Sequence, residues 1–211
     1  MISMAAKNLA DVGRFGRRFL IFNTFNTIAW QCLVGSVLVL FARRIDMPAR
    51  YVGLLMSFMP LSMVLVALAV PLIDKFGPRR LMLAIWLLRT LATTPVFLIP
   101  WAMARGGVQA GWLVLAISTL GFCLFRAFGA GAWFPWMHEM LPANSRGAYF
   151  SLEQITYQIV NIILAFIIGL ILGQHASINR FLSVESVGMA AGIFSLFLLA
   201  RVPGGGKPAK P

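Results

Sequence analysis

The stretch PLIDKFGPRR, Pro71–Arg80, separates two long apolar runs of the 211-residue sequence. It places one acid and three bases around a Gly-Pro pair. The whole chain is 60% hydrophobic and only 11% charged, whereas soluble domains carry about 25% charged residues. Charges gathered in a short break between apolar runs are typical of a loop at a membrane surface. The stretch therefore predicts a turn between two membrane-spanning helices of an all-α integral membrane protein.

Six apolar runs are long enough to cross a bilayer, which takes roughly 20 helical residues. We expect the spans at about 19–41, 51–73, 81–103, 109–136, 148–173 and 182–201. Residues 1–18 are expected to form a cytoplasmic leader, and residues 202–211 a flexible cytoplasmic tail rich in Gly, Lys and Pro. The connections are too short to hold a soluble catalytic domain, so the sequence predicts no enzyme.

The distribution of Lys and Arg predicts which side of the membrane holds the termini. The chain has 18 Lys and Arg against 6 Asp and Glu, for a net charge of +12. With both termini inside, the inner segments hold eleven of these bases and the outer loops five, as the positive-inside rule requires. The bases lie between apolar runs rather than in one stripe with aromatic residues, so we expect the lipid bilayer as a partner and no nucleic acid. The predicted location is a plasma or inner membrane of bacterial type.

The opening stretch resembles the loop between the second and third helices of the major facilitator superfamily of transporters. The matching residues, at the spacing of that family, are Asp74, Lys75, Gly77, Arg79 and Arg80. Val70 stands where the family has a leading Gly. A second stretch, Leu141–Gln154, is similar to a Pro…Arg-Gly segment between the family's helices four and five.

The two resemblances together imply a fold and a partner. They cover the chain as the N-terminal six-helix half of the facilitator fold, with two groups of three helices. The family normally has twelve helices in two such halves. The resemblance therefore implies that a second six-helix half, or a second copy of this chain, is a partner.

The charged loop has two interpretations. As a simple anchor its bases set the topology, and Gly77-Pro78 makes the turn, because Gly accepts a positive φ and Pro can open a helix. Asp74 fits an anchor poorly, because an acid at a helix C-terminus faces the negative end of the helix dipole and needs a neighbouring base. The resemblance implies instead a gating latch in which Asp74 exchanges partners between the two halves.

Polar side chains inside the apolar runs form two stripes at helical spacing. Asn23, Thr27, Trp30 and Gln31 share one face of the first span, and Glu153, Tyr157 and Asn161 share one face of the fifth. Such residues mark either a solute pathway or hydrogen bonds between helices, and for the first stripe both remain open. The resemblance implies that the first and fourth helices line a central cavity. The candidate cavity residues are Asn23, Thr27, Trp30, Gln31, Arg126, Tyr157 and Asn161.

Charged residues within the apolar runs are candidates of a second kind. Arg126 and Arg89 must face water, a carboxylate or an anionic ligand, or else extend to the membrane surface. Glu153 is either a solvated cap or the partner of a base. The candidate ion-pair residues are Glu153, Arg126, Arg89 and Arg146. Glu185 is expected at the outer interface, so no carboxylate is expected at mid-membrane.

The sequence contains no motif for other chemistry. There is no phosphate-binding loop, and His138-Glu139 lacks a second His at helical spacing, so neither a metal site nor a cofactor is predicted. Cys32 and Cys123 are expected to be buried thiols. The leading function is a transporter that moves a small-molecule solute by alternating access with a second half. The alternative is a non-transporting scaffold or assembly subunit of a larger membrane complex.

Overall fold

The computed structural model describes residues 13–206, and every regular element in that range is a helix. The α-helices are α2 (Gly13–Leu33), α3 (Ser36–Arg44), α4 (Ala49–Ser62), α5 (Ala69–Phe76), α6 (Pro78–Leu91), α7 (Ile99–Met140), α8 (Arg146–Leu172) and α9 (Ile178–Ala200). The short 3-10 helices are η1 (Met63–Leu68), η2 (Thr94–Leu98) and η3 (Ala143–Ser145). The predicted all-α fold is confirmed for these residues.

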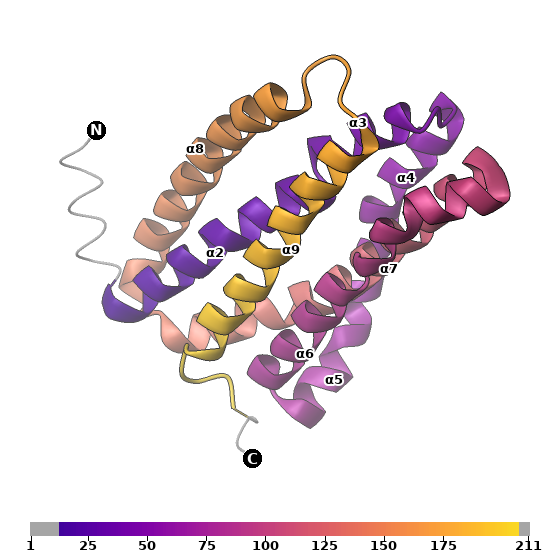
Figure 1. The fold of residues 1–211 in the computed structure, drawn as a ribbon. Coiled ribbons are helices and arrows are strands. Elements are labelled where there is room, and N and C mark those ends of the chain that lie inside the picture. The colour runs from indigo at the N-terminus through magenta and orange to yellow at the C-terminus, as the bar shows by residue number, and fades with distance from the viewer. Residues whose placement is uncertain (1–12, 207–211) are drawn as a thin grey trace.

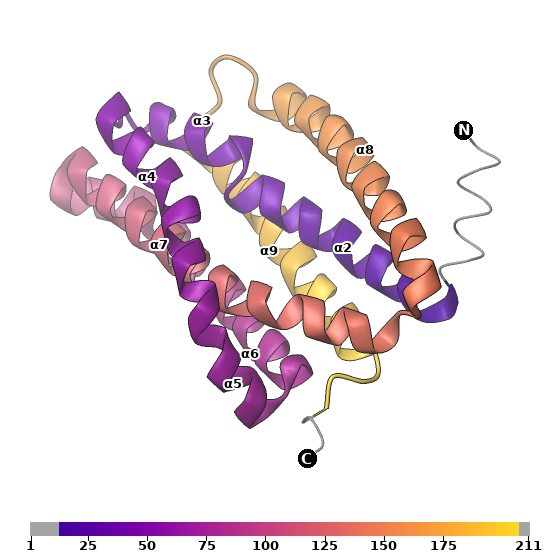
Figure 2. The same ribbon diagram turned by 180° about the vertical axis from the view of Figure 1, so that it is seen from behind.

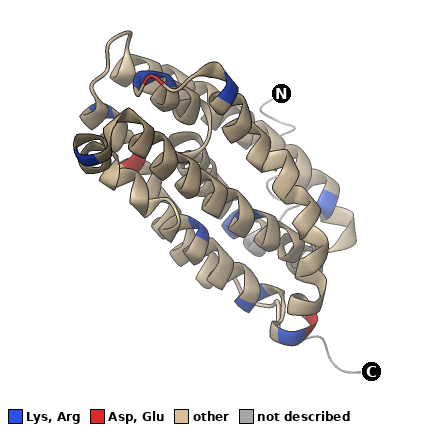
Figure 3. Ribbon diagram, turned by 90° about the vertical axis from the view of Figure 1, so that its right-hand side faces the viewer, with Lys and Arg blue, Asp and Glu red and all other residues tan. Residues whose placement is uncertain are grey.

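Five helical stretches are long and apolar enough to cross a membrane. They are Gly16–Arg44, Ala49–Phe76, Pro78–Met140, Ala143–Leu172 and Ile178–Ala200. At most half of each apolar window is buried, and in Ala143–Leu172 only 11% is. Figure 3 shows that charged residues occupy few positions along the helices. Apolar helix surface of this extent suits lipid rather than water, as in an integral membrane protein.

The longest of these stretches, with 63 residues, folds back on itself at Gly107. Gly107 has φ 71° and ψ −175°, which interrupts the helical backbone inside α7. Glycines beyond the break lie against residues before it: Gly111 against Met103, Gly121 against Ala92, and Gly129 against Trp86. The two residues of each pair lie at nearly equal sequence distances before and after residue 107. This is the pairing pattern of an antiparallel helical hairpin. The turn falls between the predicted spans 81–103 and 109–136.

The helices run lengthwise through the bundle in alternating directions (Figures 1 and 2). The start of α2, the α5–α6 turn, the α7–α8 connection and the end of α9 lie at one end, which we call the terminal end. The α3–α4 and α8–α9 connections lie at the opposite, far end. Helix α2 packs along both α9 and α8, and α6 packs along α7.

Two buried apolar clusters divide the interior. The cluster toward the terminal end includes Phe19, Phe22, Trp136 and Tyr149, and the cluster toward the far end includes Cys32, Leu33, Phe41, Phe122 and Phe181. Helix α2 contributes to both, through residues 19–22 and 29–33. The polar residues Asn23, Asn26 and Thr27 therefore lie on α2 between two apolar layers.

Both ends of the described chain differ from the expectation. Helix α2 begins at Gly13 and so includes residues 13–18 of the expected leader, and residues 1–12 and 207–211 lie outside the described residues. Residues 202–206, expected to be flexible, are held in place. Trp136 Nε1 donates to the Pro203 carbonyl at 3.0 Å, and the Gly205 N–H donates to Glu139 Oε2 at 3.0 Å. These bonds fix the chain beyond α9 against the end of α7.

Candidate functional site

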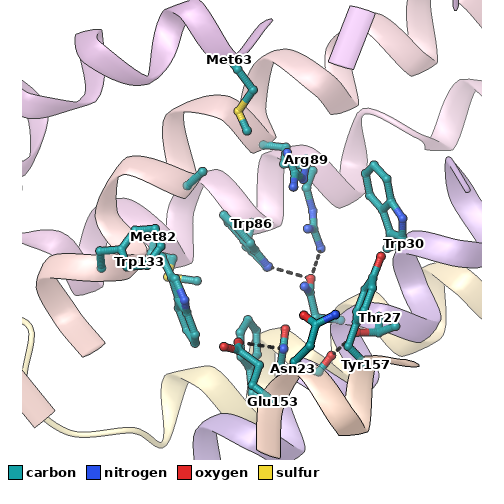
Figure 4. A pocket seen from close by; sticks show the side chains of 16 residues that line it. Asn23, Thr27, Trp30, Met63, Met82, Trp86, Arg89, Trp133, Glu153 and Tyr157 are labelled. Atoms are coloured by element: carbon teal, nitrogen blue, oxygen red, sulfur yellow. Dashed lines mark hydrogen bonds between the residues drawn. The ribbon is translucent and has the colours of Figure 1, made fainter. Parts of the chain in front are cut away.

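A cavity of about 460 Å³ lies among α2, α6, α7 and α8, between the two apolar clusters. Its polar lining comes from Asn23, Asn26, Thr27, Arg89, Arg126 and Glu153. Its aromatic lining includes Trp30, Trp86, Trp133 and Tyr157. Figure 4 shows these side chains converging from separate helices on one space. The site therefore combines charge, hydrogen-bonding groups and flat apolar walls.

Asn26 of α2 fixes the charged side of the cavity. Its Oδ1 accepts one hydrogen bond from Trp86 Nε1 at 3.0 Å and another from Arg89 Nη2 at 2.9 Å. Figure 4 shows Trp86 and Arg89 pointing from α6 to this common acceptor. The Arg89 guanidinium also lies 4.5 Å from the centre of the Trp86 ring and 5.0 Å from that of Phe122. A cation over an aromatic face at such distances is attracted by the ring quadrupole.

Among the residues that the structure describes, no acid pairs with the buried guanidinium of Arg89. Arg89 is 1% exposed, and its Nε has no hydrogen-bond partner. The neighbours that hold it, Asn26, Trp86 and Phe122, are all neutral. A buried charge held only by neutral groups is costly in a membrane interior, so this arrangement requires an explanation beyond packing.

Arg126 brings a second cation to the same cavity from α7. Its Nη1 donates to the sulfur of Met59 at 3.2 Å, and its guanidinium lies 5.0 Å from the centre of the Trp30 ring. A thioether sulfur is only a weak acceptor. The positive charges of Arg89 and Arg126 also repel each other. Within residues 13–206, neither arginine forms an ion pair, so the cavity holds two cations with weak or neutral partners.

The two polar stripes predicted from the sequence bond to each other. Asn23 Nδ2 donates to Glu153 Oε1 at 2.9 Å, and Gln31 Nε2 donates to Asn161 Oδ1 at 2.6 Å. Thr27 is buried, and its hydroxyl donates to the Asn23 carbonyl within α2. Of the predicted cavity residues, Asn23, Thr27, Trp30, Arg126 and Tyr157 line the cavity. Gln31 and Asn161 do not line it and instead join α2 to α8.

The structure does not form the predicted ion pairs. Glu153 lines the cavity, but its Oε1 accepts from Asn23 and, at 3.4 Å, from the Tyr149 hydroxyl. Arg146 instead donates to the carbonyls of Leu141 and His138 at the C-terminus of α7. Neutral donors satisfy the acid, and backbone acceptors satisfy Arg146. Glu153 and Arg126 therefore share a cavity without a direct contact.

The charged loop lies at the terminal end, and one of its basic residues, Arg79, contacts the end of α9. Gly77 has φ 80° and joins α5 to α6 in the tight turn that the sequence predicted. Arg79 Nη2 donates to the Ala200 carbonyl at 2.7 Å, and the Arg79 N–H donates to the Gly205 carbonyl at 3.1 Å. Arg80 and Lys75 are exposed. Asp74 is also exposed and, within the described part of the chain, has no ion pair with any of these bases.

Glu185 lies where the sequence did not indicate a carboxylate. It was expected at the interface, but it is 1% exposed on α9, close to Cys32 of α2. Within the described part of the chain, neither of its oxygens has a hydrogen-bond partner. It does not line the cavity. A lone acid near the end of an apolar run reads as interfacial, and only the packing of α9 against α2 reveals its burial.

The cavity residues that were not predicted from the sequence include Asn26, Trp86 and Trp133. Asn26 was visible in principle, because it lies three residues after Asn23 and four before Trp30 on one helical face. The two tryptophans carried no distinct signal, because aromatic residues are frequent throughout this apolar chain. Their role depends on which helices are neighbours.

The fold and the cavity together define a class of protein: a helical protein with membrane-spanning character and a polar, cation-bearing cavity between its helices. No family model matches the chain, and no curated protein or solved structure matches it. Within residues 13–206, no group of three or more His, Cys, Asp or Glu side chains could hold a metal ion. The function must therefore be argued from the cavity itself.

Proposed function

We propose that the protein is a membrane transporter that moves a small solute through the cavity among α2, α6, α7 and α8. The observation that carries this proposal is a cavity of about 460 Å³ with charged lining, placed between apolar layers of helices that can span a membrane. Polar and ionisable groups in such a position are costly and typically mark a substrate or ion pathway. Ligand sites in proteins have volumes of about 300–1,000 Å³, so a metabolite-sized solute fits.

The proposed topology has six crossings. A straight helix of 63 residues would be about 95 Å long, roughly three times the thickness of a bilayer core. The hairpin at Gly107 instead lets Pro78–Met140 cross twice. Both termini then lie on one side, which we propose is the cytoplasm of a bacterial-type cell; the excess of Lys and Arg on that side supports this placement. This arrangement supports a facilitator-like half bundle with two groups of three helices.

A second half would complete the cavity. Two of its lining residues, Phe134 and Gln154, are exposed at the molecular surface, and Phe134 is 54% exposed. The cavity therefore opens on one side of the single chain. We propose that a second six-helix half or a second copy of this chain covers that opening, so that rocking of the two halves gives alternating access.

Flux through vesicles tests the proposed function. The chain, purified in its native assembly, is reconstituted into liposomes with a mixture of anionic, neutral and cationic metabolites outside, and the vesicle contents are identified by mass spectrometry. We expect uptake above that of empty vesicles. Ala130→Trp, which fills the cavity, should abolish uptake, whereas Ala190→Trp on the exposed face of α9 should not. Absence of uptake under gradients of either direction would refute transport.

A further inference from the structure

We infer that the solute is a small organic anion with a flat apolar body, bound through its carboxylate or phosphate by Arg126, with Arg89 as a second positive charge in the same lining. This inference rests on the proposed function, because it names the substrate class of the same cavity. It is carried by three features of the cavity lining: uncompensated cations, unsatisfied donors and aromatic walls. The charges of the lining residues and their partners decide the sign of the ligand's charge.

The cavity has an excess of positive charge. Arg89 and Arg126 both line it, and Glu153 is the one acid among its lining residues. Glu153 already accepts hydrogen bonds from Asn23 and Tyr149 and contacts neither arginine. Each cation must find an anion or water when the protein is in a membrane. An anionic solute supplies that charge and leaves when the cavity opens.

Other arginines of this chain show what a structural role looks like. Arg44 donates to the Ala176 carbonyl, Arg79 to the Ala200 carbonyl and Arg146 to the His138 carbonyl. All three bind backbone oxygens near the ends of helices. Arg89 and Arg126 contact a side-chain amide, a thioether and aromatic rings instead. Within residues 13–206, Arg126 has no oxygen acceptor and Arg89 binds only the neutral amide oxygen of Asn26. Neither has an anionic partner there, as expected for residues that bind an anionic ligand.

The donors left open can recognise an oxyanion. Arg89 Nε has no partner although the residue is almost completely buried. Arg126 uses one nitrogen on the weak acceptor of Met59. A guanidinium presents its N–H groups as a planar fork that matches the two oxygens of a carboxylate or phosphate. The remaining N–H groups of Arg126 can therefore bind an oxyanion in the cavity. Arg89, whose Nε is enclosed, adds a second positive charge to the same lining.

The aromatic walls favour an apolar body on the solute. Trp30 faces Arg126, Trp86 faces Arg89, and Trp133 and Tyr157 complete the lining. Flat rings stack favourably on other flat apolar groups. Inorganic anions gain nothing from such walls. The geometry thus selects an aromatic or unsaturated anion over an inorganic one.

Isothermal titration calorimetry on the purified assembly tests this inference with four probes: benzoate, benzyl alcohol, benzylamine and inorganic phosphate. We expect benzoate to bind at least tenfold more tightly than the other three. Arg126→Gln should weaken benzoate binding tenfold or more, and Arg126→Lys should restore only part of it, because the fork is lost. Arg105→Gln is the matched control, since Arg105 lies 4.6 Å from the Trp101 ring but is exposed outside the cavity.

Each contrary result overturns the inference. Equal binding of benzylamine or benzyl alcohol refutes an anion site, and tighter binding of phosphate than benzoate refutes the apolar body. Failure of benzoate to bind, or benzoate affinity unchanged by Arg126→Gln, also refutes it. Vesicle uptake separates the two proposals: flux of neutral or cationic solutes alone sinks the anion class but leaves transport standing. Benzoate binding without flux of any solute sinks transport but leaves the anion site.

Discussion

Asn23 on α2 donates a 2.9 Å hydrogen bond to Glu153 on α8, and Gln31 donates a 2.6 Å bond to Asn161 two helical turns further along. In both pairs the partners are 130 residues apart in sequence. The two helices therefore run parallel in one constant register. Tyr157 lies between the two bonds on α8 and lines the cavity. These bonds hold together the two helices that form one wall of the site.

We predict that the Gln31–Asn161 bond stabilises the bundle. Gln31→Leu and Asn161→Leu should each lower the free energy of unfolding by about 0.6 kcal/mol, the average for hydrogen bonds between membrane helices, and by no more than about 1.7 kcal/mol. The double variant should lose less than the sum of the two. Denaturant unfolding in detergent, followed by tryptophan fluorescence, measures the three values.

Gln158→Leu is the control for this cycle, because Gln158 lies on the same helix but is exposed. It should leave the unfolding free energy unchanged within error. Strictly additive losses at Gln31 and Asn161 would mean that the two side chains do not interact in the folded protein.

The polar stripes of α2 and α8 could be predicted from the sequence, whereas the hydrogen-bonded pairs between them could not. Helical spacing identified one face of α2 and one face of α8, because polar residues recur there every four positions. The two stripes even have the same spacing, Asn23–Gln31 and Glu153–Asn161. Periodicity within one helix does not say which other helix it faces. The expected partner of Glu153 was therefore an arginine, whereas the structure provides Asn23.

The burial of individual polar residues could not be predicted from the sequence for the same reason. The apolar runs predicted an all-helical chain and the turn before Pro78, since both depend on local sequence. They did not predict that the expected span 19–41 is interrupted between α2 and α3, or that 51–73 contains the 3-10 helix η1. The burial of Glu185 and the contacts of Asn26 depend on how α9 and α6 pack against α2. Such long-range packing has no local signature. The structure adds the cavity, which no single helix encodes.

Close packing of α9 against α2 gives a second prediction. A side chain at Gly188 would meet Cys32 and Leu33 of α2, whereas nothing lies within 4 Å of a Cβ at Gly169. Gly188→Val should therefore destabilise the bundle by about 1–3 kcal/mol through overpacking. Gly169→Val on α8 should have little effect. Thermal unfolding of the two variants in detergent checks the difference, and equal melting temperatures would contradict the packing.

Asp74 gives a prediction about gating. If it latches two halves, Asp74→Asn should lower solute uptake tenfold or more while expression and membrane insertion stay unchanged. Asp46→Asn is the control, because Asp46 is exposed at the far end and its φ of 54° is one that Asn also adopts readily. Vesicle uptake measures both variants. Uptake by Asp74→Asn equal to that of the unaltered protein would show that the loop is only an anchor.

The hairpin at Gly107 predicts the sidedness of two exposed residues. Gln109 follows the turn, and Asn144 lies in the α7–α8 connection at the terminal end. Single cysteines at these positions should react with a membrane-impermeant maleimide from opposite sides of the membrane. The native Cys32 and Cys123 are buried, so background labelling should be low. Labelling of both positions from the same side would contradict two crossings by Pro78–Met140.

The buried Glu185 and the partly buried Glu153 should respond in opposite directions to the same substitution. Glu185→Met removes a carboxyl group whose oxygens have no partners, so it should raise the free energy of unfolding by about 1–3 kcal/mol. Glu153→Met leaves Asn23 and Tyr149 without their acceptor, so it should lower that free energy by a similar amount. Denaturant unfolding in detergent measures both. Destabilisation by Glu185→Met would instead show that its oxygens are satisfied in the membrane, most directly by water reaching the interface between α9 and α2.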